Sequence, residues 1–342
     1  MKEISFRLEN AISGKLIIND IPPYLFIKVQ EALKKDGSQK IDILGRTAKV
    51  LKLSNQNYVA YAFTYDLNYI KSNRLIRAEV EIMLASAKRI DEEIQQVKDR
   101  ADSQSKRLIH NLKSLAAKIS QEIFYVALQS NLMASHKDSL NYLEKQVTER
   151  PREAAKAMLS ILRYSTAQNT EFVAFQKLNG DVGLLTKEHH KIHKILMSVF
   201  YLFFQDFTDM HVKIDVGKSD IEGFFDYDSI HVCIYHLIEN AAKYIKPGGE
   251  FNVYISKSSN ELNIVFDMDS LTIHDDEVDK IFSEGFSGNA AKTYGLNGNG
   301  IGLFLANRMA VMNGGGLVVM NGKPPQADPK YARNKFTLAL QV

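Results

Sequence analysis

Three polar side chains of the segment HLIENAAKY have the spacing of one helix face. His236, Asn240 and Lys243 are separated by four and three residues, so their side chains lie one above another. The apolar residues around them share another face: Ile230, Ile234, Leu237, Ile238 and Ala241. An Asn carbonyl suits Mg²⁺, which takes few protein ligands when phosphate oxygens supply the others. Lys243 can neutralise phosphate charge, and Tyr244 can cover an adenine ring. On its own, this face is also typical of an ordinary amphipathic helix.

A glycine-rich segment, GNGIGL, opens a second helix further along the chain. Gly298, Gly300 and Gly302 are interleaved with Ile301 and followed by Leu303. Closely spaced glycines let backbone N–H groups approach phosphate oxygens, and the helix N-terminus favours negative charge. The spacing fits neither the P-loop nor the dinucleotide-binding fingerprint. A flexible turn is the alternative interpretation.

Between these segments, the strand-like run NIVFDMD carries Asp267 and Asp269. Either carboxylate can accept a hydrogen bond from the amino group of adenine. An acidic residue at a strand end is also a common turn signal. The residues therefore leave open both this role and the choice between the two aspartates.

Alternating helices and strands carry these segments. From residue 181 onward, helical apolar patterns alternate with runs such as FNVYIS and KFTLALQV. This order predicts an α/β sandwich over residues 181–342, with helices on one face of a mixed sheet. Cys233 lies in an apolar helix and is expected to be a core residue. His189, His190 and His193 have helical metal-ligand spacing, but without a clear third ligand we expect a solvated helix face.

A long helical region over residues 71–178 precedes this domain. From Ile76 to Ala101, apolar or small residues recur at alternating steps of four and three, which is the seam of a coiled coil. A second step of four near His110 is a stutter, and the imidazole faces away from the apolar stripe. A second helix over residues 140–175, interrupted near Pro151, completes an antiparallel hairpin. Two hairpins make a four-helix bundle, so we expect a homodimer.

Residues 1–70 mix short apolar runs with turn residues and predict a small α+β module. Its paired strand candidates, IDILGRTAKVLKLSN and YVAYAFTYD, flank residues 54–57. A strand pair followed by a long helix faintly resembles the end of a PAS sensor domain. A dimerisation or packing cap is an equally good interpretation.

Composition limits the classes of function. The chain has 342 residues, with 43 Lys and Arg against 40 Asp and Glu, and one cysteine. A net charge of +3 is too small to predict nucleic acid as the main partner. One cysteine excludes an intrachain disulfide framework. The longest apolar run, 195–204, is about half the length that spans a bilayer. We expect two or three domains in a soluble, cytoplasmic protein without membrane insertion.

Taken in order, these segments resemble the ATP-binding domain of the histidine kinase, gyrase, chaperone and mismatch-repair ATPases, and among them the histidine kinases. HLIENAAKY is similar to the N-box, DMDSL to a degenerate first glycine box, KIFSEGF to the F-box and GNGIGL to the second glycine box. LIHNLKSL, around His110, resembles the phosphoacceptor H-box. The resemblance covers residues 181–342 and extends through the hairpin to about residue 73. It implies an α+β multidomain chain with a dimeric four-helix bundle.

The resemblance also implies roles for the matching residues. Asn240 would bind Mg²⁺. The ATP contacts would be Asn240, Lys243, Tyr244, Asp267 or Asp269, Phe286, Gly298, Gly300, Ile301, Gly302 and Leu303. Residues 287–297 would form the ATP lid. His110 would accept the γ-phosphoryl group and pass it to an aspartate on the receiver domain of a response regulator. By helical spacing, Lys113 can hold a phosphoryl group and Ser114 can orient a water.

Two departures from the family pattern matter. Asp269 and Leu271 occupy positions where glycines are expected. Asn111 and Leu115 replace the acidic residue and the proline that follow the phosphoacceptor, and Asn cannot act as a base. The motifs, taken in order, lead us to interpret the chain as a histidine kinase. The two departures favour the alternative, an ATP-binding switch or scaffold that lacks autokinase activity. An ATP hydrolase is disfavoured, because the hydrolases of this superfamily have Glu at the position of His236. Among the kinases, His at this position resembles the chemotaxis kinases.

Overall fold

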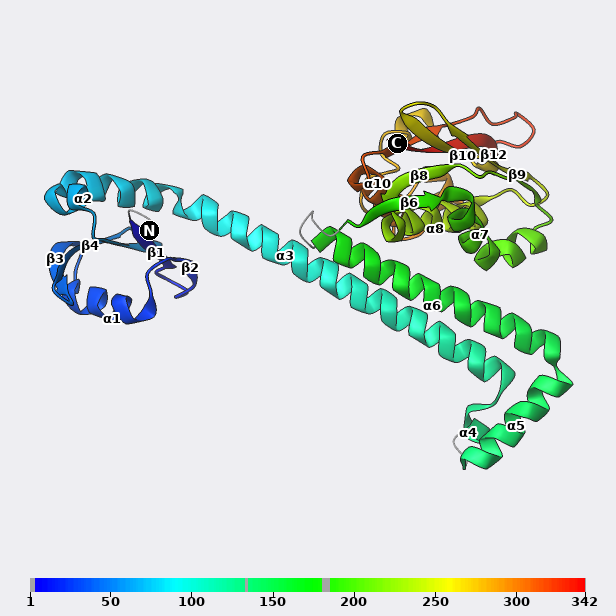
Figure 1. Cartoon of the computed structure of the whole chain (residues 1–342), viewed down its shortest axis with the longest axis horizontal. Helices are drawn as coiled ribbons and strands as arrows, with labels where there is room; N and C mark the ends of the chain where they lie inside the picture. Colours follow the sequence, from blue (N-terminus) through cyan, green and yellow to red (C-terminus); the bar gives the residue numbers. More distant parts are fainter. Residues whose placement is uncertain (1–3, 133–134, 180–184, 342) are drawn as a thin grey trace. The chain divides into compact units, whose positions relative to one another are not determined.

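The chain folds into two compact units, Met1–Ser105 and Lys106–Val342, in the computed structural model (Figure 1). The division falls within the helix α3 (Asn73–Val126). The structure describes residues 4–132, 135–179 and 185–341. The expected start of the catalytic domain, residue 181, lies outside the described residues.

The first unit is an antiparallel sheet of five strands in the order β2-β1-β5-β4-β3. Its strands are β1 (Ser5–Asn10), β2 (Leu16–Asn19), β3 (Gly37–Ile43), β4 (Arg46–Ser54) and β5 (Tyr58–Thr64). The helix α1 (Pro23–Ala32) packs on one face through Phe26 and Val29. The short helix α2 (Leu67–Lys71) leads into α3. Residues 1–70 thus contain the α+β elements that the sequence predicts.

The first turns of α3 cover the other face of this sheet. Ile76, Val80 and Ala87 are fully buried there, in one cluster with Leu8. The sequence pattern assigns these three residues to a coiled-coil seam, and that part of the prediction is wrong. An apolar stripe with steps of four and three fits a sheet face as well as a second helix. Seam positions from residue 90 onward remain partly or fully exposed.

The second unit begins with the predicted helical hairpin. After α3 come α4 (Gln129–Leu132), α5 (His136–Glu149) and α6 (Pro151–Asn179), with the expected break at Pro151. The helix α6 runs back beside the C-terminal half of α3 (Figure 1). Gln168 donates its Nε2 to the carbonyl of Leu112 at 3.2 Å. Lys118 Nζ lies 5.5 Å from the ring centroid of Tyr164.

The rest of the unit is a sandwich of helices on one face of a five-stranded mixed sheet, as predicted. The strand order is β11-β12-β10-β9-β7, and β7 is parallel to β9. The strands are β7 (Lys213–Val216), β9 (Glu250–Lys257), β10 (Glu261–Leu271), β11 (Gly316–Met320) and β12 (Tyr331–Gln341). The core lies between this sheet and the helices α7 (Ile192–Asp209), α8 (Tyr227–Tyr244) and α10 (Gly302–Met312).

The histidine-rich segment forms a strand, not the expected helix. His189 and His190 lie in β6 (Lys187–Lys191), which pairs with β8 (Glu222–Asp226), and their rings contact Phe224 and Phe225. Alternation in a strand points neighbouring residues to opposite faces, so the proposed helical ligand spacing does not exist. Within the described ranges, no group of three or more His, Cys, Asp and Glu side chains could hold a metal ion.

Cys233 is a fully buried core residue, as expected, and burial raises the pKa of its thiol. None of the helices in the described part of the chain has both the length and the apolar character needed to cross a membrane.

Candidate nucleotide-binding site

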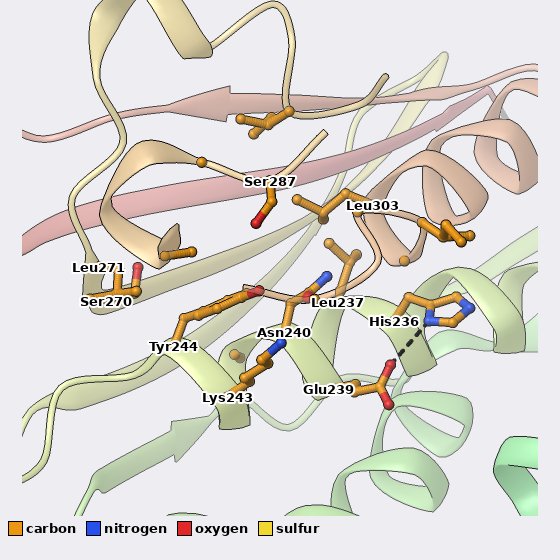
Figure 2. Close-up of a pocket in the computed structure, with 18 of the residues that line it drawn as sticks. His236, Leu237, Glu239, Asn240, Lys243, Tyr244, Ser270, Leu271, Ser287 and Leu303 are labelled. Atoms are coloured by element: carbon orange, nitrogen blue, oxygen red, sulfur yellow. Dashed lines mark hydrogen bonds and ion pairs between the residues drawn. The ribbon is translucent and has the colours of Figure 1, made fainter. Parts of the chain in front are cut away.

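A cavity of about 470 Å³ lies beside the C-terminal half of α8. Its wall is formed by α8, the end of β10, the glycine-rich segment before α10, and the hairpin helices α3 and α6. Most of the residues predicted for the site line this one cavity: His236, Asn240, Lys243, Tyr244, Phe286, Gly298, Gly300, Ile301, Gly302 and Leu303. Figure 2 shows the polar side chains of α8 along one side of it.

The helix α8 is anchored at its N-terminus. The carboxylate of Asp226 accepts the backbone N–H of Ser229 at 2.9 Å, which satisfies one of the unpaired donors of the first turn. The middle of the helix is almost entirely buried. Because this part is fixed in the core, the last two turns hold Asn240 and Lys243 at the cavity wall.

The glycine-rich segment lies so close to α8 that side chains would fill the space between them. A Cβ added at Gly298 would come 2.8 Å from Nζ of Lys243, and one at Gly302 would lie 3.4 Å from Nδ2 of Asn240. The glycines therefore keep a narrow space open beside an amide and an ammonium group. Such a space suits phosphate oxygens.

Gly300 joins this segment to the phenylalanine segment KIFSEGF. It has φ +65°, and an added Cβ would lie 2.4 Å from the carbonyl oxygen of Phe286. The N–H of Gly285 donates to the carbonyl of Gly300 at 2.9 Å. A left-handed backbone with this close approach admits only glycine at low cost. The two motifs, separate in sequence, thus form one wall of the cavity.

His236 pairs with Glu239 on the same helix, as the dashed line in Figure 2 shows. The distance between Nδ1 and Oε2 is 3.2 Å, and the imidazole is 4% exposed. Its Nε2 is buried without a hydrogen-bond partner. Nδ1 also lies 3.4 Å from the position of an added Cβ at Gly302. His236 therefore lies between Glu239 and the start of α10.

Neither Asp267 nor Asp269 lines the cavity, so the expected adenine contact is not where the sequence places it. Arg333, on the neighbouring strand β12, donates its Nε to Asp267 at 2.6 Å, and its Nη1 lies 3.3 Å from a carboxylate oxygen of Asp269. In a strand, alternate side chains face opposite sides of the sheet. The inward side belongs to Met268 and Ser270, which do line the cavity.

Sequence reasoning missed the end of the cavity formed by β10 and the segments that follow it. Met268, Ser270, Leu271, Thr272 and Ile273 line this end. Alternation of buried residues along the strand is the signal that could have found the first two. The predicted lid contains the short helix α9 (Asn289–Thr293), whose two alanines cluster with Leu271 and Tyr244.

The hairpin supplies further lining residues: Asn111, Lys118 and Glu171. Asn111 directly follows His110, whose side chain is exposed. Lys113 and Ser114 are also exposed and do not line the cavity. The predicted phosphoacceptor is therefore one residue from the wall of the candidate nucleotide site.

The charge of the lining fits a nucleotide with a divalent cation. Two ammonium groups, of Lys118 and Lys243, face three carboxylates, of Glu171, Glu239 and Glu277. Such a lining cannot neutralise a triphosphate by itself, and Mg²⁺ supplies the missing positive charge when it binds with phosphate.

Comparison with known proteins agrees with this geometry. Residues 225–341 match the family described as histidine kinase-, DNA gyrase B-, and HSP90-like ATPases. The sensor protein SrrB from Staphylococcus aureus strains NCTC 8325 / PS 47 and COL is 25% identical to this chain over 220 residues, which is 61% of this chain and 36% of the relative. The chain therefore spans about a third of the length of these curated relatives.

Two solved structures match parts of this chain. The mycobacterial sensor histidine kinase MprB matches with a TM-score of 0.39 and 18% identity, over 46% of this chain and 97% of that chain. Full-length ShkA in complex with AMPPNP matches with a TM-score of 0.44 and 14% identity, over 70% of this chain and 45% of that chain.

The sandwich, the cavity beside α8 and the family match define the C-terminal domain as a histidine kinase-, gyrase B- and HSP90-like ATPase domain. Over more residues than this domain contains, the chain is similar to a sensor protein, SrrB, and its ATP-binding domain is of the GHKL type found in histidine kinases. The ATPase-domain family, the helical hairpin and the α/β sandwich that the motifs indicate are thereby confirmed.

Proposed function

We propose that this chain is an ATP-dependent protein histidine kinase that phosphorylates its own His110. The observation that carries the proposal is that Asn111, the next residue, lines the same cavity as Asn240, Lys243 and the glycine-rich segment. A nucleotide whose phosphates lie beside these glycines has its reactive end within the part of the cavity to which the hairpin contributes.

In the proposed step, a ring nitrogen of neutral His110 attacks the γ-phosphorus of ATP. A nitrogen–phosphorus bond forms while the bond between this phosphorus and the bridging oxygen breaks, ADP leaves, and the ring gives up its proton. Lys243 would contact the phosphates, Asn240 would hold the Mg²⁺ ion that supplies positive charge beside them, and the protein contributes mainly positioning. Asn111 cannot take the proton, so this chain would react slowly or pass the proton to water.

Incubation with γ-labelled ATP and Mg²⁺ tests this proposal. Phosphohistidine is labile in acid and stable in base, so the label should vanish after acid treatment and survive alkali. It should also be absent from His110→Ala. Label that survives acid, or that persists in His110→Ala, would show that another residue is modified.

We further propose that the kinase acts as a homodimer and passes its phosphoryl group to a receiver-domain aspartate of a response regulator. Exposed apolar side chains on both hairpin helices support the dimer: Ile109, Ile123 and Tyr125 on α3, and Leu159 and Leu162 on α6. A second hairpin would cover such side chains in a four-helix bundle.

The second candidate function is an ATP-binding switch without autokinase activity. The amide at Asn111 favours it, because no carboxylate follows the phosphoacceptor to receive its proton. Nucleotide binding without any labelled histidine would establish this alternative.

A further inference from the structure

We propose that the cavity accepts both adenine and guanine nucleoside triphosphates. The base meets a hydroxyl group, which can donate or accept a hydrogen bond, whereas a site selective for adenine needs a group that only accepts one. This inference rests on the proposed function, since it concerns the nucleotide bound at the same site. The residue that carries it is Ser270.

The positions of the glycines fix which end of the cavity holds the phosphates. Gly298 and Gly302 lie against Lys243 and Asn240, so the triphosphate belongs beside these groups. Figure 2 shows Tyr244, Ser270 and Leu271 together at one end, and His236 with Glu239 at the other. The base must therefore lie at the end where Ser270 closes the cavity.

Ser270 is held in place but keeps its hydrogen-bonding freedom. It is 4% exposed, and its Oγ accepts Nδ2 of the fully buried Asn334 at 2.9 Å. A hydroxyl has one donor and two acceptor lone pairs, so one lone pair and the O–H remain for a ligand. The hydroxyl of the neighbouring Thr272 donates to the carbonyl of Pro329 at 2.9 Å.

The two purines differ at the atom that such a group meets. Adenine carries an amino donor at C6, and guanine carries a carbonyl acceptor at the same place. A carboxylate only accepts, so at this atom it pairs with the amino group of adenine and repels the carbonyl oxygen of guanine. A serine hydroxyl can rotate, so that it accepts a hydrogen bond from the amino group of adenine or donates one to the carbonyl of guanine. It therefore does not discriminate strongly between the two bases.

The carboxylates of this region are bound elsewhere. Asp267 and Asp269 face the outer side of the sheet and pair with Arg333. Glu277 does line the cavity, but it is 2% exposed, and its oxygens accept the backbone N–H groups of His274 at 3.1 Å and Asn289 at 2.6 Å. These bonds join the segment after β10 to the start of α9. We therefore assign Glu277 to holding α9 and not to reading the base.

Calorimetric titration of the full chain with AMPPNP and with GMPPNP, each with Mg²⁺, tests the inference. We expect the two dissociation constants to agree within about tenfold, the range typical of a site without a selective hydrogen bond. Tighter binding of AMPPNP by more than that would overturn the inference and leave the proposed function intact. Failure of both analogues to bind would overturn the proposed function as well.

The variant Ser270→Asp places an acceptor-only group at the base end. It should raise the preference for AMPPNP over GMPPNP at least about tenfold. Ser256→Asp adds the same charge at an exposed position of β9 and should leave the preference unchanged. An unchanged ratio in folded Ser270→Asp would show that the base lies elsewhere and overturn the inference. Should that variant not fold, the ratio for the natural chain still decides.

Discussion

The ammonium of Lys177 lies 2.9 Å from the carboxylate of Asp226, and the two side chains are 11% and 4% exposed. This pair joins the last turns of α6 to the N-terminus of α8. Burial alone would raise the pKa of Asp226, but hydrogen bonds from Ser229, Lys177 and the N–H of Thr186 outweigh it and lower the pKa below its usual range. The ionised carboxylate therefore stabilises the contact between the hairpin and the ATP-binding domain.

Asp226→Asn should destabilise the second unit by about 3 kcal/mol at pH 7, because it leaves a buried ammonium without that partner. A carboxyl with a lowered pKa in the folded state contributes stability above its unfolded pKa of about 3.9, and this is lost as the pH falls through the folded value. The difference in unfolding free energy between Asp226→Asn and the natural chain should thus shrink below about pH 4. Hydrogen exchange of the α8 amides measures this difference in stability. Asp228→Asn, at an exposed position of the same helix turn, is the control; an equal effect there would contradict the prediction.

Gly300→Ala should weaken nucleotide binding at least about tenfold, because the methyl group would displace the loop from Phe286 at a left-handed backbone. Gly248 has φ +71° and no atom within 4 Å of an added Cβ. Gly248→Ala therefore imposes the same backbone strain without the clash. Comparable affinities in the two variants, measured by calorimetry, would show that the close approach is unimportant.

Asn240→Ala should lower the affinity for AMPPNP in Mg²⁺ at least about tenfold by removing the proposed ligand. Asn252, on β9, does not line the cavity, and Asn252→Ala should leave the affinity unchanged. The domain should stay folded in both, as judged by circular dichroism. Undiminished affinity in Asn240→Ala would remove this residue from the metal site.

Chelation of Mg²⁺ by EDTA should weaken AMPPNP binding to the natural chain by at least about tenfold, because the lining carries more carboxylates than ammonium groups. The same treatment should have little effect in Asn240→Ala. Equal loss of affinity in both proteins would indicate a metal ligand other than Asn240.

Asn111→Glu should raise the rate of His110 labelling at least about tenfold, because it restores a base beside the nucleophile. Asn111→Gln lengthens the side chain equally without adding a base and should not raise the rate. A rise in both variants, seen by following label over time, would exclude proton acceptance as the cause.

Leu159→Glu with Leu162→Glu should shift the chain from dimer to monomer, because both side chains lie exposed on α6. Val318→Glu alters an equally exposed apolar residue on β11 and should leave the dimer intact. Light scattering at micromolar concentration distinguishes the species. A natural chain that is already monomeric would refute the proposed dimer.

Local signals predict much of this fold and site. Pro151 separates α5 from α6, the glycines precede α10, and the apolar period of α8 places Asn240 and Lys243 on one face. These features depend on neighbours within a few residues, so the sequence contains them directly.

Other features depend on distant partners. Asp267 and Asp269 fit a motif of carboxylates near a base, but the buried alternation of β10 turns them outward, where Arg333 of β12 holds them. Lys118 and Glu171 line the cavity because the hairpin packs against the ATP-binding domain. Contacts over such sequence distances leave no local pattern in one chain.

The burial of Ile76, Val80 and Ala87 against the N-terminal sheet has a consequence for where this module can be cut or fused. A fragment that stops at residue 70 would leave Leu8 and its apolar neighbours facing water, and it should aggregate. The portable unit has to include the first turns of α3. A chimaera that keeps residues 1–90 and exchanges the remainder preserves the folded module, whereas one joined at the end of the sheet divides a hydrophobic core.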